Sequence, residues 1–259
     1  MRQPLLKWVY TIMHLRKDST GFVYLDSAID SALLEEFEML TRRPESLLGK
    51  LDNAGLPAIY DAIKPDEFLD FVDFLVFHTQ NLGGQAAPYL DGLDRVLQAS
   101  GSAWTVGQRD GHAALEKRVP EGVVTAVDET VANAGEAGSL LAEAWRAVFG
   151  RSPDPEDAYE KAIKAVEEAG AHVVSPKNEK ATLGTMIRDM KAQKSWSLDL
   201  PTDGASVPVE MADALWAAQE SRHGGNGYRK PTHAEAEAAV MLAVPLVQWF
   251  TSGAIKRRS

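Results

Sequence analysis

One uncharged stretch near the C-terminus constrains the fold most. From Ala238 to Ile255 the chain carries no Asp, Glu, Lys or Arg, and three basic residues follow. The stretch is nearly long enough to span a bilayer, but its alanines, Pro245 and the polar residues of its last third make it weakly hydrophobic. We therefore expect a helix buried by the segments 139–149 and 155–170, and not a membrane anchor.

The start of this helix has its own signal. Thr232-His233-Ala234-Glu235 is a capping-box sequence, in which the threonine and glutamate side chains each bind a backbone N–H that the helix leaves unpaired. Pro245 lies inside the helix and predicts a kink.

Four more helices are predicted before it in the C-terminal half. Apolar residues recur at helical spacing in 139–149, 155–170, 181–191 and 209–222. Asp154, followed by Pro155 and two acids, predicts the N-terminal cap of the second of these helices.

The N-terminal half is also predicted to be helical, with periodic apolar residues over 28–40 and a second helix that opens at Pro65. Residues 103–118 instead predict a β-hairpin around Asp110-Gly111, expected to be the only sheet. Residues 120–136 are interpreted as a connector, although their apolar spacing also fits a helix. The fold class is therefore mainly α. It divides into a helical region at 1–102, a hairpin and connector at 103–134, and a helical bundle at 135–259.

Composition limits the function. A net charge of -10 repels polyanions, so contact with a nucleic acid needs a local basic patch. The chain has no cysteine, and the apolar run 5–13 is broken by Lys7, so we predict no disulfide, no signal peptide and a cytoplasmic location without a membrane partner. Phosphate loops, nucleophile elbows and metal-ligand spacings are absent, and we expect no metal and no cofactor.

A local basic patch does occur between the last two predicted helices. Residues 221–234 include Arg222, Arg229, Lys230, His223 and His233 but no acid. Arg222 falls near the apolar face of its predicted helix and needs an acceptor. Two interpretations stay open: the patch binds phosphate and His223 transfers protons, or Arg222 caps the carbonyls at the end of its helix.

The order of four motifs resembles the HEPN-like C-terminal domains of bacterial and phage-borne abortive-infection proteins, over about residues 135–255. The motifs are Asp-Pro-Glu-Asp-Ala-Tyr-Glu-Lys-Ala (154–162), Lys-Ala-Thr-Leu-Gly (180–184), Arg-His-Gly (222–224) and Leu-Val-Gln-Trp-Phe (246–250). The resemblance implies a homodimer that cuts RNA without a metal. Arg222 and His223 would be catalytic, and Arg229, Lys230 and His233 would bind the RNA phosphates.

The sequence departs from that family at one point. The family places four to six residues between its arginine and its histidine, whereas here His223 is adjacent to Arg222, and Gly227 and Tyr228 stand where the pattern expects the histidine. We therefore carry two hypotheses. The first is a HEPN-like protein of phage or anti-phage defence that binds RNA at a dimeric basic site, with cleavage left open. The alternative is a non-catalytic helical interaction protein, antitoxin-like or regulatory, whose acidic N-terminal half binds a protein partner.

Overall fold

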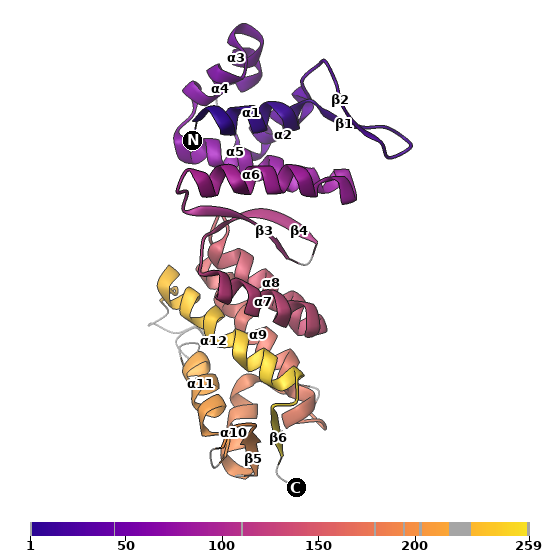
Figure 1. The fold of residues 1–259 in the computed structure, drawn as a ribbon. Helices are drawn as coiled ribbons and strands as arrows, with labels where there is room; N and C mark the ends of the chain where they lie inside the picture. The colour runs from indigo at the N-terminus through magenta and orange to yellow at the C-terminus, as the bar shows by residue number, and fades with distance from the viewer. Residues whose placement is uncertain are drawn as a thin grey trace. The chain divides into compact units, whose positions relative to one another are not determined.

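The computed structural model describes residues 2–43, 45–109, 111–178, 180–193, 195–201, 204–217 and 229–257. The protein is mainly helical, as the sequence predicts (Figure 1). The chain forms two compact units, Met1–Arg118 and Val119–Ser259. The boundary assigns the predicted hairpin to the first unit and the segment after it to the second.

Helices α1 to α6 and the 3-10 helix η1 build the first unit. Their bounds are α1 Arg2–Met13, α2 Ser31–Thr41, α3 Leu47–Ala54, α4 Leu56–Ala62, α5 Pro65–His78, η1 Thr79–Gln85 and α6 Ala87–Ala99. The core of this unit centres on α5, whose Phe71, Val72 and Leu75 are fully buried. The apolar run at 5–13 lies in α1. Its residues Val9 and Met13 are buried in the same core.

Two antiparallel hairpins belong to the first unit. Strand β3 (Trp104–Arg109) pairs with β4 (His112–Lys117), with Val106 opposite Leu115, which confirms the predicted hairpin. Strand β1 (Leu15–Lys17) pairs with β2 (Val23–Leu25). The expectation of a single sheet was therefore wrong. A strand of three residues is too short to show an alternating pattern.

Helices α7 to α12 build the second unit. Their bounds are α7 Glu121–Asn133, α8 Gly135–Phe149, α9 Pro155–Val174, α10 Leu183–Gln193, α11 Ser206–Ala217 and α12 His233–Thr251. Of the two interpretations of 120–136, the helical one is confirmed over Glu121–Asn133, where Val127 and Thr130 are buried. Strands β5 (Trp196–Leu198) and β6 (Ile255–Arg257) form a third antiparallel sheet.

Helix α9 does not end at Gly170 as predicted but continues to Val174. A Cβ atom at Gly170 would overlap the side chain of Met186 and press on the ring of Phe250. The glycine therefore lets α10 and α12 pack closely on α9, and it does not stop the helix.

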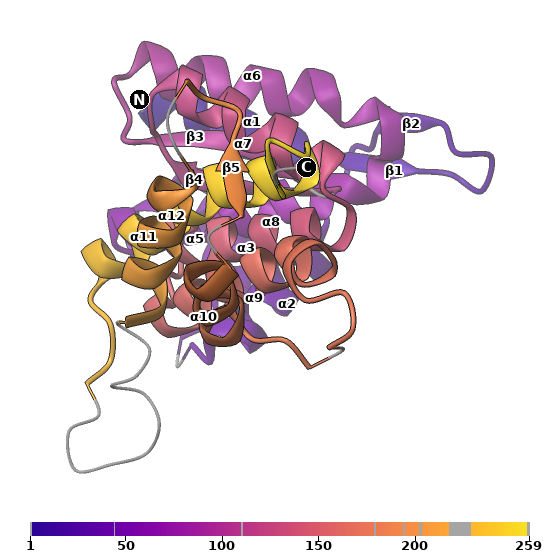
Figure 2. The same cartoon turned by 90° about the horizontal axis from the view of Figure 1, so that it is seen from below.

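Helix α12 packs on α8 and α9, as predicted (Figures 1 and 2). Val240, Ala243, Leu246 and Val247 are buried in the core of the unit, and the helix continues through Pro245. Over the ranges given above, no helix combines the length and hydropathy that crossing a bilayer requires.

Both predicted helix caps are confirmed. The Asp154 carboxylate accepts the backbone N–H groups of Glu156 and Asp157, each at 3.1 Å. Thr232 and Glu235 form the reciprocal capping box, with the Thr232 N–H 2.7 Å from the Glu235 carboxylate.

Candidate functional site

The predicted catalytic pair, Arg222 and His223, lies outside the residues that the structure describes. The three predicted phosphate-binding residues are described: Arg229 and Lys230 precede α12, and His233 is its first residue. Their surroundings define what this segment can bind.

Arg229 forms a two-point ion pair with Glu235. Its Nη1 donates to Oε2 at 2.8 Å and its Nη2 donates to Oε1 at 2.6 Å. The hydrogen bond from Arg229, together with the backbone N–H of Thr232, lowers the pKa of Glu235 to about 2, and the same pairing raises the pKa of Arg229. This arrangement uses the planar guanidinium in the way it would be used on a phosphate. Glu235 therefore occupies the position that a phosphate ligand would need.

Lys230 and His233 also lie beside carboxylates. The Lys230 Nζ is 3.1 Å from Oε2 of Glu156, in the first turn of α9. The His233 Nε2 is 3.9 Å from Oε2 of Glu237, one turn further along α12. The segment itself contains no acid, but the fold supplies one to each of its three described basic side chains.

A cavity of about 360 Å³ lies between the start of α9 and the segment before α12. Its lining includes Asp154, Glu156 and Lys230. The N-terminus of a helix is a general site for anions because its N–H groups are unpaired. Here the Asp154 carboxylate already accepts two of those groups, so the cavity does not have the character of a phosphate site.

Sequence reasoning could have found two of these pairings. Glu235 stands at the third helical position of the capping box, which places it near Thr232 and the residues before it. Glu237 lies four residues after His233 on the same predicted helix, so the two were expected to be neighbours. Glu156 is far from Lys230 in the sequence, and only the packing of α12 on α9 brings the two together.

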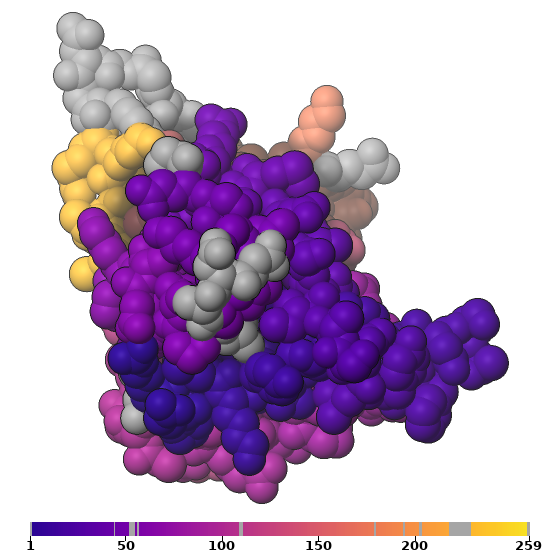
Figure 3. Space-filling model, turned by 90° about the horizontal axis from the view of Figure 1, so that it is seen from above, coloured from indigo at the N-terminus to yellow at the C-terminus, as the bar shows by residue number. Residues whose placement is uncertain are grey.

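The first unit carries three exposed apolar side chains close together on one hairpin, which the sequence did not reveal. Phe22, Tyr24 and Leu25 on the β1–β2 hairpin are 64%, 42% and 63% exposed. The hairpin stands out from the helices of this unit (Figures 1 and 3). A short strand with exposed apolar residues gives no periodic signal that distinguishes it from a buried strand.

Hydrogen bonds fix the conformation of this hairpin. The turn is held by the Asp18 carboxylate, which accepts the backbone N–H groups of Thr20 at 2.8 Å and Phe22 at 3.0 Å. The hydrogen bond from the Thr20 hydroxyl, and after it these backbone bonds, lower the pKa of Asp18.

Two further bonds tie the hairpin to η1. Lys17 donates to the carbonyl of Asn81 at 3.0 Å, and Gln85 donates to that of Gly21 at 2.8 Å. The exposed apolar residues therefore lie on an ordered support.

Compared with protein-family models, curated proteins and solved structures, the chain has no match. The HEPN-like resemblance therefore stays a prediction, and function has to be argued from the chain itself.

Proposed function

We propose that this chain is a non-catalytic helical interaction protein and that its β1–β2 hairpin contacts a protein partner. The observation that carries the proposal is the exposure of Phe22, Tyr24 and Leu25 on one ordered hairpin. Aromatic residues are enriched at the centres of protein interfaces, and a rigid support lowers the entropy lost on binding.

Charge supports a protein partner over RNA. Arg229, Lys230 and His233 each lie beside a glutamate, and the chain as a whole carries a net charge of -10. A polyanion would have to displace these carboxylates and overcome the overall repulsion. A protein that binds the exposed apolar residues of the hairpin does not have to displace these carboxylates or overcome this repulsion.

The positive test uses cross-linking. A photo-reactive phenylalanine analogue replaces Tyr24, which lies on the same face of the strand as Phe22, and, in a matched control, the exposed residue Gln98 of α6. We expect a discrete cross-linked protein in cells only from the Tyr24 position, and its loss when Phe22→Ser is added. Equal cross-linking from both positions, or none from either, would contradict the proposal.

The test against RNA uses the purified protein and total RNA in excess chelator. We expect neither cleavage nor retention of the RNA. Cleavage by the wild type that disappears in an Arg222→Ala, His223→Ala double variant would replace this proposal with the ribonuclease hypothesis. The homodimer implied by the resemblance is a separate prediction, which sedimentation over a concentration series tests.

A further inference from the structure

Strand β2 is bonded to β1 through alternate residues. At one end of the strand, the Asp26 N–H donates to the carbonyl of His14 at 2.8 Å. At the other end, the Phe22 carbonyl accepts the N–H of Asp18 at 3.0 Å. Hydrogen-bonded and non-bonded pairs alternate along an antiparallel ladder, so Tyr24 is the residue between these ends whose backbone faces β1.

The two remaining residues of β2 leave its outer edge open. The backbone N–H and C=O groups of Val23 and Leu25 point away from β1, because these residues occupy the non-bonded positions of the ladder. Over the residues that the structure describes, no hydrogen bond reaches these groups. They form a row of donors and acceptors that a strand from another chain is able to pair with.

This edge lacks the usual protection against a second strand. Natural proteins protect open edges with charged side chains, proline or bulges. Strand β1 has such charges in Arg16 and Lys17, whereas residues 22–25 read Phe-Val-Tyr-Leu, without a charge or a proline. Three of these four residues are aromatic or β-branched, the types that favour strands. The ladder over Val23–Leu25 is also continuous and has no bulge.

Apolar side chains flank the edge on both faces of the hairpin. Side chains alternate along a strand, so Phe22 and Tyr24 lie on one face and Leu25 lies on the other. Leu25 shares its face with Leu15, its partner in the ladder, but Leu15 is buried and Leu25 is exposed. A strand placed beside β2 would cover apolar surface on both faces and pair the open backbone groups.

From these observations we infer that an extended segment of the partner protein adds to β2 as a third strand. Its backbone pairs with Val23 and Leu25, and it carries apolar side chains on both of its faces. A segment of roughly five residues spans such an edge. A second copy of this chain is the weaker occupant, since each copy carries a net charge of -10. The inference rests on the proposed function, because it assigns a binding mode to the same hairpin.

Hydrogen exchange tests the binding mode directly. The probe is a synthetic peptide with the sequence of the segment that cross-links to the Tyr24 position, read by mass spectrometry. In the free protein, we expect the amides of Val23 and Leu25 to exchange rapidly and that of Tyr24 slowly. In the complex, exchange at Val23 and Leu25 should slow by about tenfold or more, because both N–H groups become paired.

The outcomes separate this inference from the proposed function. Absence of any cross-linked protein at the Tyr24 position contradicts both. A cross-linked partner whose peptide binds at saturation without protecting Val23 and Leu25 contradicts strand addition alone, and the contact through the hairpin side chains remains.

Two variants at one exposed position separate the backbone from the side chain. Leu25→Pro removes the N–H, and an edge strand accepts proline where the N–H faces away from its partner. Leu25→Ala removes the side chain and keeps the N–H. We expect the peptide to bind Leu25→Pro about tenfold or more weaker than Leu25→Ala, since a hydrogen bond is lost and the ring lies in the way of the added strand. Equal affinities refute strand addition when Tyr24 still exchanges slowly in Leu25→Pro, and if Tyr24 loses its protection, the wild-type exchange decides alone.

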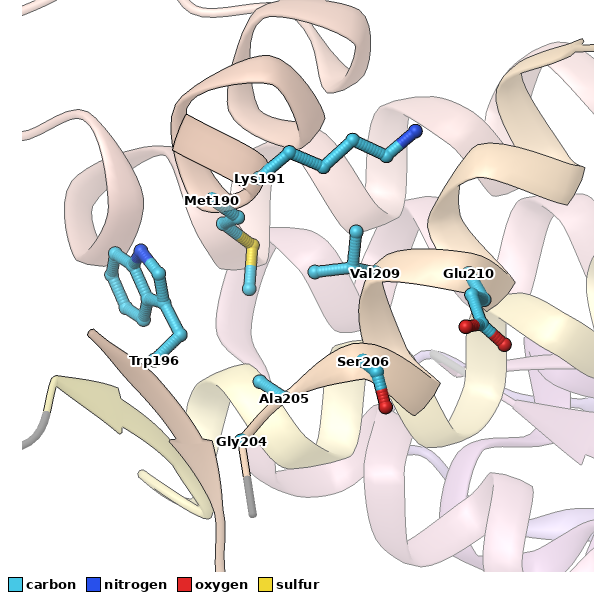
Figure 4. Close-up of a pocket in the computed structure, with 8 residues that line it drawn as sticks. All are labelled: Met190, Lys191, Trp196, Gly204, Ala205, Ser206, Val209 and Glu210. Atoms are coloured by element: carbon cyan, nitrogen blue, oxygen red, sulfur yellow. The ribbon is translucent and has the colours of Figure 1, made fainter. Parts of the chain in front are cut away.

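Two other occupancies are read in the same experiments. A dimer of the free protein that Leu25→Pro dissociates, seen by sedimentation, would assign the edge to a second copy and overturn the inference. A cavity of about 340 Å³ in the second unit, between the end of α10, strand β5 and the start of α11, has apolar walls that include Met190 and Trp196 (Figure 4). A peptide that moves the amide signal of Ser206, in the lining of this cavity, and leaves β2 unprotected would bind there instead, which also rules out strand addition.

Discussion

The Glu235 carboxylate accepts hydrogen bonds from both terminal nitrogens of Arg229 and from the backbone N–H of Thr232. One side chain thus closes the first turn of α12 and pairs with the basic segment before it. With the ion pairs of Lys230 and His233, this pairing leaves each basic side chain of 229–234, the described part of the acid-free segment, beside a glutamate.

Removing Arg229 should release the carboxylate of Glu235. In Arg229→Ala we expect the pKa of Glu235 to rise from about 2 toward its usual range, because the strongest hydrogen bond to the carboxylate is gone. A ¹³C titration of the glutamate carboxyl signals measures it. Lys230→Ala is the control and should leave the pKa unchanged. A Glu235 pKa that stays near 2 without Arg229 would refute the assignment.

The same carboxylate predicts a dependence of stability on acid. The folded pKa of Glu235 is lowered, so its contribution to the free energy of unfolding is fully present above the unfolded value of 4.5 and is lost as pH falls through about 2. We expect Glu235→Gln to be less stable than the wild type at neutral pH. The difference should shrink between about 4.5 and 2, as measured by denaturant unfolding at a series of pH values. A constant difference over that range would be inconsistent with this account.

The pKa of Glu167 is shifted in the opposite direction from that of Glu235. Burial raises its pKa, although its carboxylate accepts the N–H of Leu183 at 2.7 Å. A raised folded pKa means that stability is highest with the group protonated and decreases as pH rises through the folded pKa. Glu167→Gln keeps an acceptor for Leu183 without the charge, so we expect a more stable protein at neutral pH and equal stability in acid below 4.5. The exposed Glu168→Gln serves as the control, and a destabilised Glu167→Gln at neutral pH would contradict the prediction.

Gly170 should not tolerate a methyl group. In Gly170→Ala the new Cβ overlaps the terminal methyl of Met186 and presses on the ring of Phe250, and since the Met186 side chain is flexible and Phe250 needs to move only a little, we expect a loss of about 1 kcal/mol in the free energy of unfolding. Gly122→Ala, in α7 of the same unit, has open space around its Cβ and should lose nothing. In a Met186→Ala background the same substitution at Gly170 should cost less, because the overlapping side chain is gone, although Met186→Ala is itself destabilising. Chemical denaturation of the wild type, the three single variants and the double variant decides it, and equal stability of Gly170→Ala and Gly122→Ala would disprove the packing argument.

Long periodic segments and caps were predictable from the sequence. Asp154 and Thr232 identify the starts of α9 and α12, because capping uses residues that are adjacent in the chain. The partner of Lys230 was not predictable, since Glu156 meets it only through the packing of two helices. The β5–β6 sheet was missed for the same reason. Trp196 and Arg257 are distant in the sequence, and each strand is three residues long.

That sheet has a consequence for biosynthesis. Trp196 leaves the ribosome well before Arg257, by about 3–12 s at translation rates of roughly 5–20 residues per second. During this interval β5 has no partner strand, and the indole lacks the guanidinium that covers it in the finished fold. The nascent chain therefore exposes an apolar ring and an unpaired strand edge while α12 is still being synthesised. We expect chaperones to bind the chain mainly during this interval.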